Sequence, residues 1–192
     1  MKLRRLELKD ATLMLKWMHD PSVVEYLQAD FASMPTEDCL RFIESAQNAA
    51  HDLHLAIADD EDEYQGTVSL KHISGGTAEF AIAIRKSAMG KGFSEYGMKE
   101  ALRIAFERLG LDAVYWCVSP ENRRACRFYD KQGYRRFHVM KDSGLYRDFV
   151  RGGTGRSRLP DTIGIGWTRR WQKGKTEPTE YSGNPSFCGN AA

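Results

Sequence analysis

The chain has 192 residues, of which 42% are hydrophobic and 28% charged, and its formal net charge is +2 at pH 7. This composition is that of an ordinary globular domain, long enough to bury a core without disulfide or metal cross-links. The small net charge gives no indication of a nucleic-acid partner, since such proteins more often carry a strongly basic patch. No apolar run approaches the ~18 residues that span a bilayer, so we predict no membrane partner.

The cysteine pattern and the first residues predict a reduced, metal-free protein in the cytoplasm. No two cysteines form a C-x-x-C pair, and none has metal-ligand spacing with the five histidines. The four cysteines are Cys39, Cys117, Cys126 and Cys188. Residues 1–10 contain no apolar stretch of the kind found in signal peptides. We therefore predict reduced thiols, no bound metal and a cytoplasmic location.

The first half of the chain predicts helices between short strands. Residues 3–8 alternate apolar and charged side chains, which predicts a strand, and Asp10 is placed to cap the helix that follows. A second helix is predicted over residues 38–50, with Thr36 as its cap. Short turns then join strands that we predict as an antiparallel meander, over residues 53–58, 64–73 and 78–84.

The second half predicts two strand–helix units and a closing hairpin. An amphipathic helix is predicted over residues 93–109, and a second helix follows with Asn122 as its cap. Between them, residues 113–118 form a near-continuous apolar run typical of a buried central strand. Because it follows a strand–helix passage, this strand should lie parallel to residues 78–84. The hairpin is predicted over residues 134–140 and 145–150.

The character of the sequence changes at residue 151. Residues 152–192 are rich in Gly and Arg and show little periodicity, apart from a short segment over residues 163–171. We therefore predict one domain over residues 1–151 and a poorly packed C-terminal extension over residues 152–192.

Two glycines lie where the predicted strand over residues 78–84 joins the predicted helix over residues 93–109. Gly90 and Gly92 let the backbone adopt positive φ or come close to a ligand oxygen, and a helix N-terminus presents free N–H groups. We therefore predict an anion site, with a tight turn that binds nothing as the alternative. The Walker motif G-x-x-x-x-G-K-[ST] is absent, and Glu95 stands in place of the third glycine of the dinucleotide-binding motif.

Three segments make the chain resemble the GNAT family of N-acetyltransferases, in particular its RimJ/RimL-like branch. Residues 89–94 are similar to the family's [QR]-x-x-G-x-[GA] motif, with Met89 and Ser94 as departures. Residues 122–134 match N-x-x-[AS]-x-x-x-Y-x-x-x-G-[FY], and residues 15–21 resemble an early W-x-x-D-P segment. The resemblance covers roughly the first 150 residues. It implies an α/β (α+β) fold: a mixed, mostly antiparallel central sheet with a splayed parallel pair and flanking helices.

The resemblance implies direct transfer of acetyl from acetyl-CoA to a primary amine of a small molecule, an amino sugar or a protein N-terminus. The glycine loop would bind the pyrophosphate of CoA, and the pantetheine arm would pair with a strand end. Tyr129 is the implied acid for the departing thiolate, because its reference pKa of about 10 lies above that of a thiol. The alternative for Tyr129 is a core residue. The CoA-binding residues implied are Ala83, Ile84, Arg85, Met89, Gly90, Lys91, Gly92, Phe93, Ser94 and Asn122.

Several roles stay open in the sequence. Glu79 is a candidate base for the ammonium proton, with a solvent-facing strand residue as the alternative. Asn122 contacts CoA, caps a helix, or does both. Lys86 and the arginines of residues 123–127 contact CoA phosphates or form a solvated face. Aromatic residues line the acceptor pocket or the core, namely Trp17 and Phe31.

Two functions of another class remain as alternatives at this point. One is an acyl-CoA-binding module without catalysis, since the base is unassigned and the last predicted strand is short. The other is a phosphate-binding regulatory domain. The resemblance also leaves a homodimer open.

Overall fold

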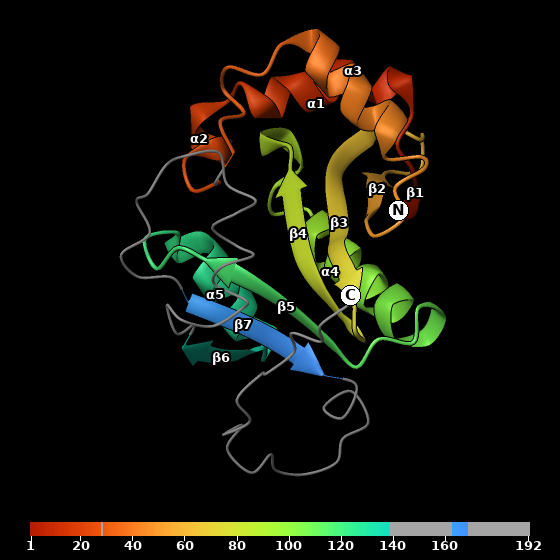
Figure 1. Ribbon diagram of the computed structural model, residues 1–192. Helices are drawn as coiled ribbons and strands as arrows, with labels where there is room; N and C mark the ends of the chain where they lie inside the picture. The colour runs from red at the N-terminus through yellow and green to blue at the C-terminus, as the bar shows by residue number, and fades with distance from the viewer. Residues whose placement is uncertain (28, 139–162, 169–192) are drawn as a thin grey trace.

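The computed structural model describes residues 1–27, 29–138 and 163–168 of the chain (Figure 1). Its described strands form one sheet in the order β1-β2-β3-β4-β5-β7-β6. They are β1 (Lys2–Arg5), β2 (Leu53–Ala58), β3 (Tyr64–Ser74), β4 (Thr77–Ile84), β5 (Ala113–Val118), β6 (Arg135–His138) and β7 (Ile163–Thr168). Neighbouring strands are antiparallel, except that β4 and β5 are parallel. The predicted fold class is therefore confirmed.

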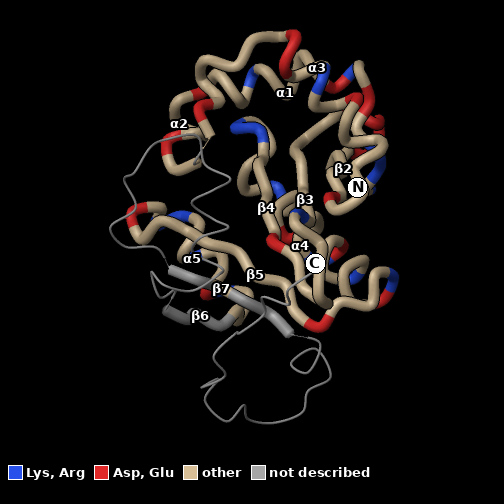
Figure 2. The backbone as a smooth tube through the Cα atoms, viewed as in Figure 1, with Lys and Arg blue, Asp and Glu red and all other residues tan. Residues whose placement is uncertain are grey.

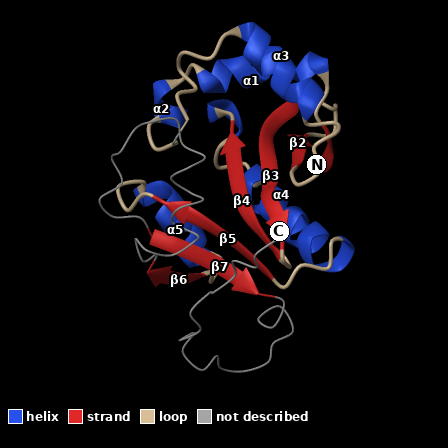
Figure 3. Cartoon of the chain, viewed as in Figure 1, coloured by secondary structure: helices blue, strands red, loops and turns tan. Residues whose placement is uncertain are grey.

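Helices cover both faces of this sheet (Figure 3). They are α1 (Ala11–Met18), α2 (Pro21–Val24), α3 (Thr36–Ser45), α4 (Phe93–Arg103) and α5 (Arg123–Lys131). Two short 3-10 helices, η1 (Leu8–Asp10) and η2 (Lys86–Ala88), and a π-helical segment, η3 (Ile104–Arg108), complete the set. Ile57 of β2 packs in the core cluster that contains α4 and α5, whereas the adjacent Ala56 packs in the cluster that contains α1 and α3. Because consecutive strand residues point to opposite faces, the two helix pairs cover opposite faces. No helix in the described part of the chain is long and apolar enough to cross a membrane.

The parallel strands β4 and β5 pair over a short stretch and then diverge. Their registered pairs are Thr77 with Ala113, Ala78 with Val114, and Glu79 with Tyr115. Residues 80–84 stay paired with β3 on one side, and the rest of β5 pairs with β7 (Figure 1). The edge of β4 that faces β5 therefore has no strand partner over residues 80–84 within the described chain, and its main-chain groups are available to a ligand.

Most predicted elements are present, but Thr36 is not a cap, and Asp10 holds the N-cap position of α1 without a side-chain capping bond. β2 and β5 have the predicted bounds, and Asn122 caps α5 by accepting a hydrogen bond from the N–H of Ala125 at 3.1 Å. Thr36 is the first residue of α3 rather than its cap, and Pro35 holds the N-cap position. Asp10 makes no capping bond to α1, because its carboxylate is bound elsewhere.

The C-terminal part of the sheet differs from the prediction. Ile163–Thr168, which we placed in the extension, forms β7 between β5 and β6. Ile165 is fully buried in the cluster with α4 and α5, so burial of its side chain favours the strand despite its glycine neighbours. The predicted strand over residues 145–150 lies outside the described residues. The boundary at residue 151 stays a prediction.

A buried ion pair holds the N-terminal strand to the first helix. The Nη1 and Nη2 atoms of Arg4 each donate to a carboxylate oxygen of Asp10 at 2.8 Å, and Asp10 is 1% exposed. The backbone N–H of Glu7 donates to the same carboxylate at 2.9 Å. The hydrogen bond to Asp10 is the main reason why the pKa of Arg4 is raised. This pair fixes where β1 ends and α1 begins.

We expect Asp10→Ala to lower the free energy of unfolding by about 3 kcal/mol, because a nearly buried guanidinium would lose its bidentate partner. Urea denaturation of the two proteins measures the change. Asp38→Ala is the control, since the Asp38–Arg41 pair is exposed, and it should cost less than about 1 kcal/mol. Equal losses for the two substitutions would contradict a structural role for the buried pair.

Candidate functional site

The glycine loop has the open backbone geometry that an anion site requires. Gly90 and Gly92 have φ of 78° and 88°, and Gly92 is the N-cap of α4 in the left-handed region. No described side chain caps this helix, so the N–H groups of its first turn make no capping hydrogen bonds. Among the described residues, a Cβ on Gly90 would meet no atom within 4 Å, and one on Gly92 would meet only Met1 Cε, at 3.8 Å. The space outside the loop is therefore open to a ligand.

Basic groups lie beside this loop. Nη1 of Arg124, in the first turn of α5, is 2.6 Å from the sulfur of Met89. Lys91 is exposed, and Ser94 is half-buried in the first turn of α4. Arg124 of α5 thus places a positive charge beside Met89, which occupies the position where the family motif has Gln or Arg.

Arg85 is held by other protein groups. Its Nη1 atom donates to Oε1 of Glu63 and to the carbonyl of Tyr64, both at 2.7 Å, and its backbone N–H donates to Gln65 at 3.0 Å. Ala83 and Ile84 precede it in β4 and are registered with Thr67 and Gly66 of β3. Their contact with CoA stays a prediction, and the guanidinium of Arg85 has protein partners of its own.

Tyr129 is nearly buried on α5, at 8% exposure. Its ring centroid is 5.4 Å from that of Trp116 on β5 and 5.3 Å from that of Phe128. Burial raises the pKa of Tyr129 well above its usual value, so the hydroxyl keeps its proton at any ordinary pH. The side chain is thus both a core residue and a permanently protonated donor.

Glu79 is enclosed rather than solvent-facing, so that alternative was wrong. It is 9% exposed, and its carboxylate lies 2.8 Å from Lys71 Nζ and 3.2 Å from His72 Nδ1. Its neighbour Phe80 packs in the cluster with α4, so Glu79 points to the opposite face. On that face, burial first and the charge of Glu79 second raise the pKa of Cys117 to about 12.

Glu79 and Tyr129 lie at the same level of the sheet but on opposite faces. Glu79 is registered with Tyr115, and the next residue, Trp116, contacts Tyr129. This level is the last paired position before β4 and β5 diverge. Sequence reasoning missed Lys71 and His72 beside Glu79. His72 has φ of 53° at an irregular end of β3, and strand periodicity does not predict such a position.

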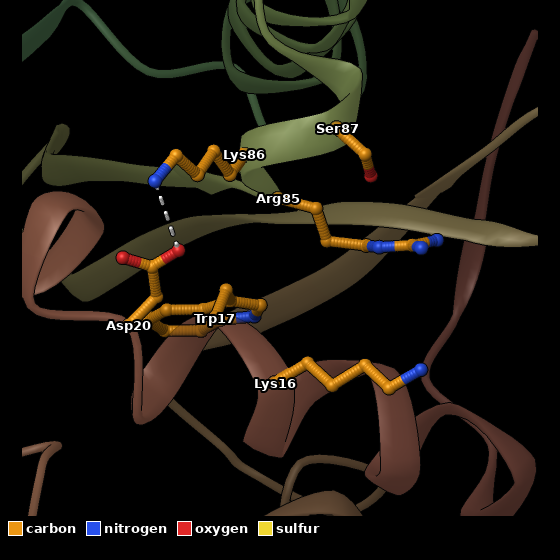
Figure 4. Close-up of a pocket in the computed structure, with 6 residues that line it drawn as sticks. All are labelled: Lys16, Trp17, Asp20, Arg85, Lys86 and Ser87. Carbon is orange, nitrogen blue, oxygen red and sulfur yellow. Dashed lines mark ion pairs between the residues drawn. The ribbon is translucent and has the colours of Figure 1, made fainter.

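A cavity of about 370 Å³ lies between α1 and the end of β4 (Figure 4). It is lined by Lys16, Trp17, Asp20, Arg85, Lys86 and Ser87. Trp17 both lines this cavity and packs in the core, whereas Phe31 packs on Trp17 with ring centroids 5.2 Å apart and is not a lining residue. Sequence reasoning missed Lys16, Asp20 and Ser87, although two of them lie within the W-x-x-D-P segment. Among the described residues no group of three His, Cys, Asp or Glu side chains is placed to hold a metal ion.

Comparison with known proteins identifies the family. The family model described as "acetyltransferase (GNAT) domain" matches residues 1–135. The chain therefore belongs to the GNAT acetyltransferase family and is an acetyltransferase. It is 25% identical over 146 residues to an uncharacterized N-acetyltransferase p20 of Bacillus licheniformis, covering 73% of this chain and 82% of that one. It is 22% identical over 137 residues to acetyltransferase PseH of Campylobacter jejuni subsp. jejuni, covering 71% and 84%.

Solved structures confirm the fold. A spermidine N-acetyltransferase from Vibrio cholerae, in complex with CoA and spermine, aligns with a TM-score of 0.71 at 20% identity, covering 87% of this chain and 94% of that one. An acetyltransferase of the GNAT family from Bacillus anthracis aligns with a TM-score of 0.69 at 19% identity, covering 86% and 93%. The predicted family is therefore confirmed, and the RimJ/RimL-like branch stays a prediction.

Two buried tryptophans differ in one hydrogen bond. Trp17 and Trp116 are 4% and 2% exposed. The indole N–H of Trp17 donates to the hydroxyl of Tyr64 at 2.8 Å. That of Trp116 is buried without a hydrogen-bond partner within the described part of the chain, which leaves its desolvation uncompensated.

We expect Trp17→Phe to lower the free energy of unfolding by about 1–2 kcal/mol more than Trp116→Phe. Both changes remove a similar volume, but only the first breaks a hydrogen bond, whereas the second removes a buried, unpaired donor. Guanidinium denaturation monitored by circular dichroism gives both values. A larger loss for Trp116→Phe would mean that its N–H does have a partner.

Proposed function

We propose that this acetyltransferase moves the acetyl group of acetyl-CoA directly to a primary amine, and that it belongs to the RimJ/RimL-like branch. The observation that carries the proposal is the divergence of β4 and β5, with an open glycine loop at one end and Tyr129 and Glu79 on either side. The W-x-x-D-P segment supports the branch, because Trp17 and Asp20 both line the cavity. The neighbour from Vibrio cholerae was solved with CoA, which supports the choice of donor.

The glycine loop suits the pyrophosphate of CoA. Its positive-φ backbone and the free N–H groups at the start of α4 provide donors, and the helix dipole favours a negative charge there. Arg124 and Lys91 add positive charge beside the loop. The amide-bearing pantetheine arm would then pair with the free edge of β4 at Ala83 and Ile84, as an added strand does.

The two candidate residues divide the proton transfers. Glu79, directly or through a water molecule, accepts a proton from the acceptor's ammonium group, and the free amine then attacks the thioester carbonyl carbon. As the new C–N bond replaces the C–S bond, the sulfur takes a proton from the Tyr129 hydroxyl. The acylated nitrogen then loses its second proton, which restores the Tyr129 hydroxyl. Because burial raises the pKa of Tyr129, this hydroxyl is a constant hydrogen-bond donor but a weak acid. We therefore expect its hydrogen bond to stabilise the thiolate before the proton moves.

The test of the function is incubation with acetyl-CoA and an amine library, with mass spectrometry of the products. An N-acetylated product together with free CoA supports the proposal. Binding of CoA without thiol release for any amine would overturn it.

Tyr129→Phe should lower kcat by one to two orders of magnitude with little change in the affinity for CoA, because the leaving sulfur loses its donor. In the unmodified enzyme, kcat should not fall between pH 8 and pH 10 through ionisation of this raised-pKa hydroxyl. Steady-state rates and a pH profile measure both. Tyr134→Phe is the matched control, because it removes the hydroxyl of a neighbouring tyrosine. The ring centroids of Tyr129 and Tyr134 are 6.4 Å apart. If Tyr129→Phe has an unchanged rate, Tyr129 is not the acid.

Gly92→Val should reduce the affinity for CoA at least about tenfold, because a β-branched residue is strained at φ of 88° and would distort the loop. Gly75→Val is the control: Gly75 also has positive φ and open space, but it lies in the turn between β3 and β4. Calorimetric titration with CoA, after thermal melting to show that both variants fold, gives the affinities. Equal affinities in the two variants would remove the loop from the CoA site.

A further inference from the structure

The cavity between α1 and the end of β4 has an unbalanced charge. Three of its lining residues are cations, Lys16, Arg85 and Lys86, and one is a carboxylate, Asp20. Arg85 is paired with Glu63, which does not line the cavity. Counting that pair as neutral, two cations face one carboxylate, so one positive charge remains.

That remaining charge is on Lys16. Within the described chain no carboxylate lies within ion-pair distance of its ammonium group, whereas Lys86 is 3.8 Å from Asp20. Figure 4 shows the Lys16 side chain extending along the floor of the cavity, on the side of Trp17 away from Lys86 and Asp20. Figure 2 shows the basic end of β4 facing α1 across this space. Lys16 is exposed, and a cation without an ion-pair partner at the rim of a cavity that carries excess positive charge favours an anionic group in the ligand.

The single carboxylate is already occupied. Oδ1 of Asp20 accepts hydrogen bonds from the backbone N–H and the hydroxyl of Ser22, at 2.9 and 2.7 Å, and Oδ2 faces Lys86. The hydroxyl bond of Ser22 is the main reason why the pKa of Asp20 is lowered. A polyamine with several ammonium groups would find no free carboxylate among the described residues that line the cavity, and would meet the charge of Lys16.

The wall of the cavity that Trp17 forms is flat and held in place by hydrogen bonds. The indole N–H of Trp17 is held by Tyr64, whose hydroxyl also contacts Thr67 Oγ1 at 2.6 Å, so the ring cannot turn without breaking this chain of hydrogen bonds. A flat apolar wall opposite cationic side chains suits a small molecule that has both an apolar face and an anionic group. The volume lies near the lower end of the range of about 300–1,000 Å³ for small-molecule sites.

We propose that this cavity binds an anionic group, a phosphate or a carboxylate, carried by the amine acceptor, with Lys16 as the residue that selects it. The acceptor is then an anionic small molecule such as an acidic or phosphorylated amino sugar, and not a polyamine. This inference rests on the proposed N-acetyltransferase function, because it assigns the acceptor of that reaction.

Calorimetric titration of the full chain, saturated with CoA, tests the proposal without turnover. The ligands are glucosamine, glucosamine 6-phosphate, glucosaminic acid and spermidine, so that the phosphate and carboxylate arms are separate. We expect at least one anionic sugar to bind about tenfold more tightly than glucosamine, and spermidine to bind more weakly than either. Lys16→Gln should reduce that preference to about threefold or less. Lys99→Gln, which removes an exposed lysine of α4, should leave it unchanged.

Three outcomes would overturn the inference. They are failure of both anionic sugars to bind more tightly than glucosamine, tighter binding of spermidine, and an equal effect of Lys16→Gln and Lys99→Gln. The titration with CoA comes first and is read separately. If CoA does not bind, the proposed function has failed, and titration of the same sugars into the protein alone still tests the cavity.

Discussion

The divergence of β4 and β5 is the constraint on which the rest of the site depends. Two parallel strands would ordinarily satisfy each other's main-chain groups along their whole length, but here they do so over three residue pairs. β5 finds a second partner in β7, so its hydrogen bonds are satisfied on that side. The free edge of β4 has no such substitute within the described chain. A ligand with its own amide groups fits this edge. The pantetheine arm of an acyl-CoA donor has such amide groups, as a strand does.

This geometry also explains why the candidate acid and base do not lie together. A residue on β4 at the point of divergence can face one side of the sheet, while a residue on α5 approaches from the other. Glu79 lies beside Lys71 and His72, whereas Tyr129 lies among aromatic rings. The sheet therefore separates a polar environment from an apolar one. Burial on the apolar side raises the pKa of Tyr129, so this hydroxyl keeps its proton.

The sequence predicted the parts of this arrangement that depend on local patterns. The apolar run of β5, the cap at Asn122 and the glycines before α4 each follow from neighbouring residues, and the structure has all three. It did not predict β7, because the partners of that strand lie some distance away in the chain and glycines weaken its propensity. It misassigned Asp10, since a bond from Arg4 replaced a local cap. The neighbours of Glu79, Lys71 and His72, depend on strand register, which periodicity alone does not give.

The position of the cavity beside α1 depends on a segment of the chain that also leads to the glycine loop. Residues 85–87 line the cavity and lead directly into the glycine loop. Arg85 anchors this segment through its side chain to Glu63 and Tyr64 and through its backbone to Gln65, so it cannot move independently of β3. Trp17 is fixed to the same strand through Tyr64. Both walls of the cavity are therefore held by β3. The same strand pairs with β4, whose free edge would bind the donor. A reaction that joins two molecules gains most when their sites are held rigidly with respect to each other, and in this protein one strand does that.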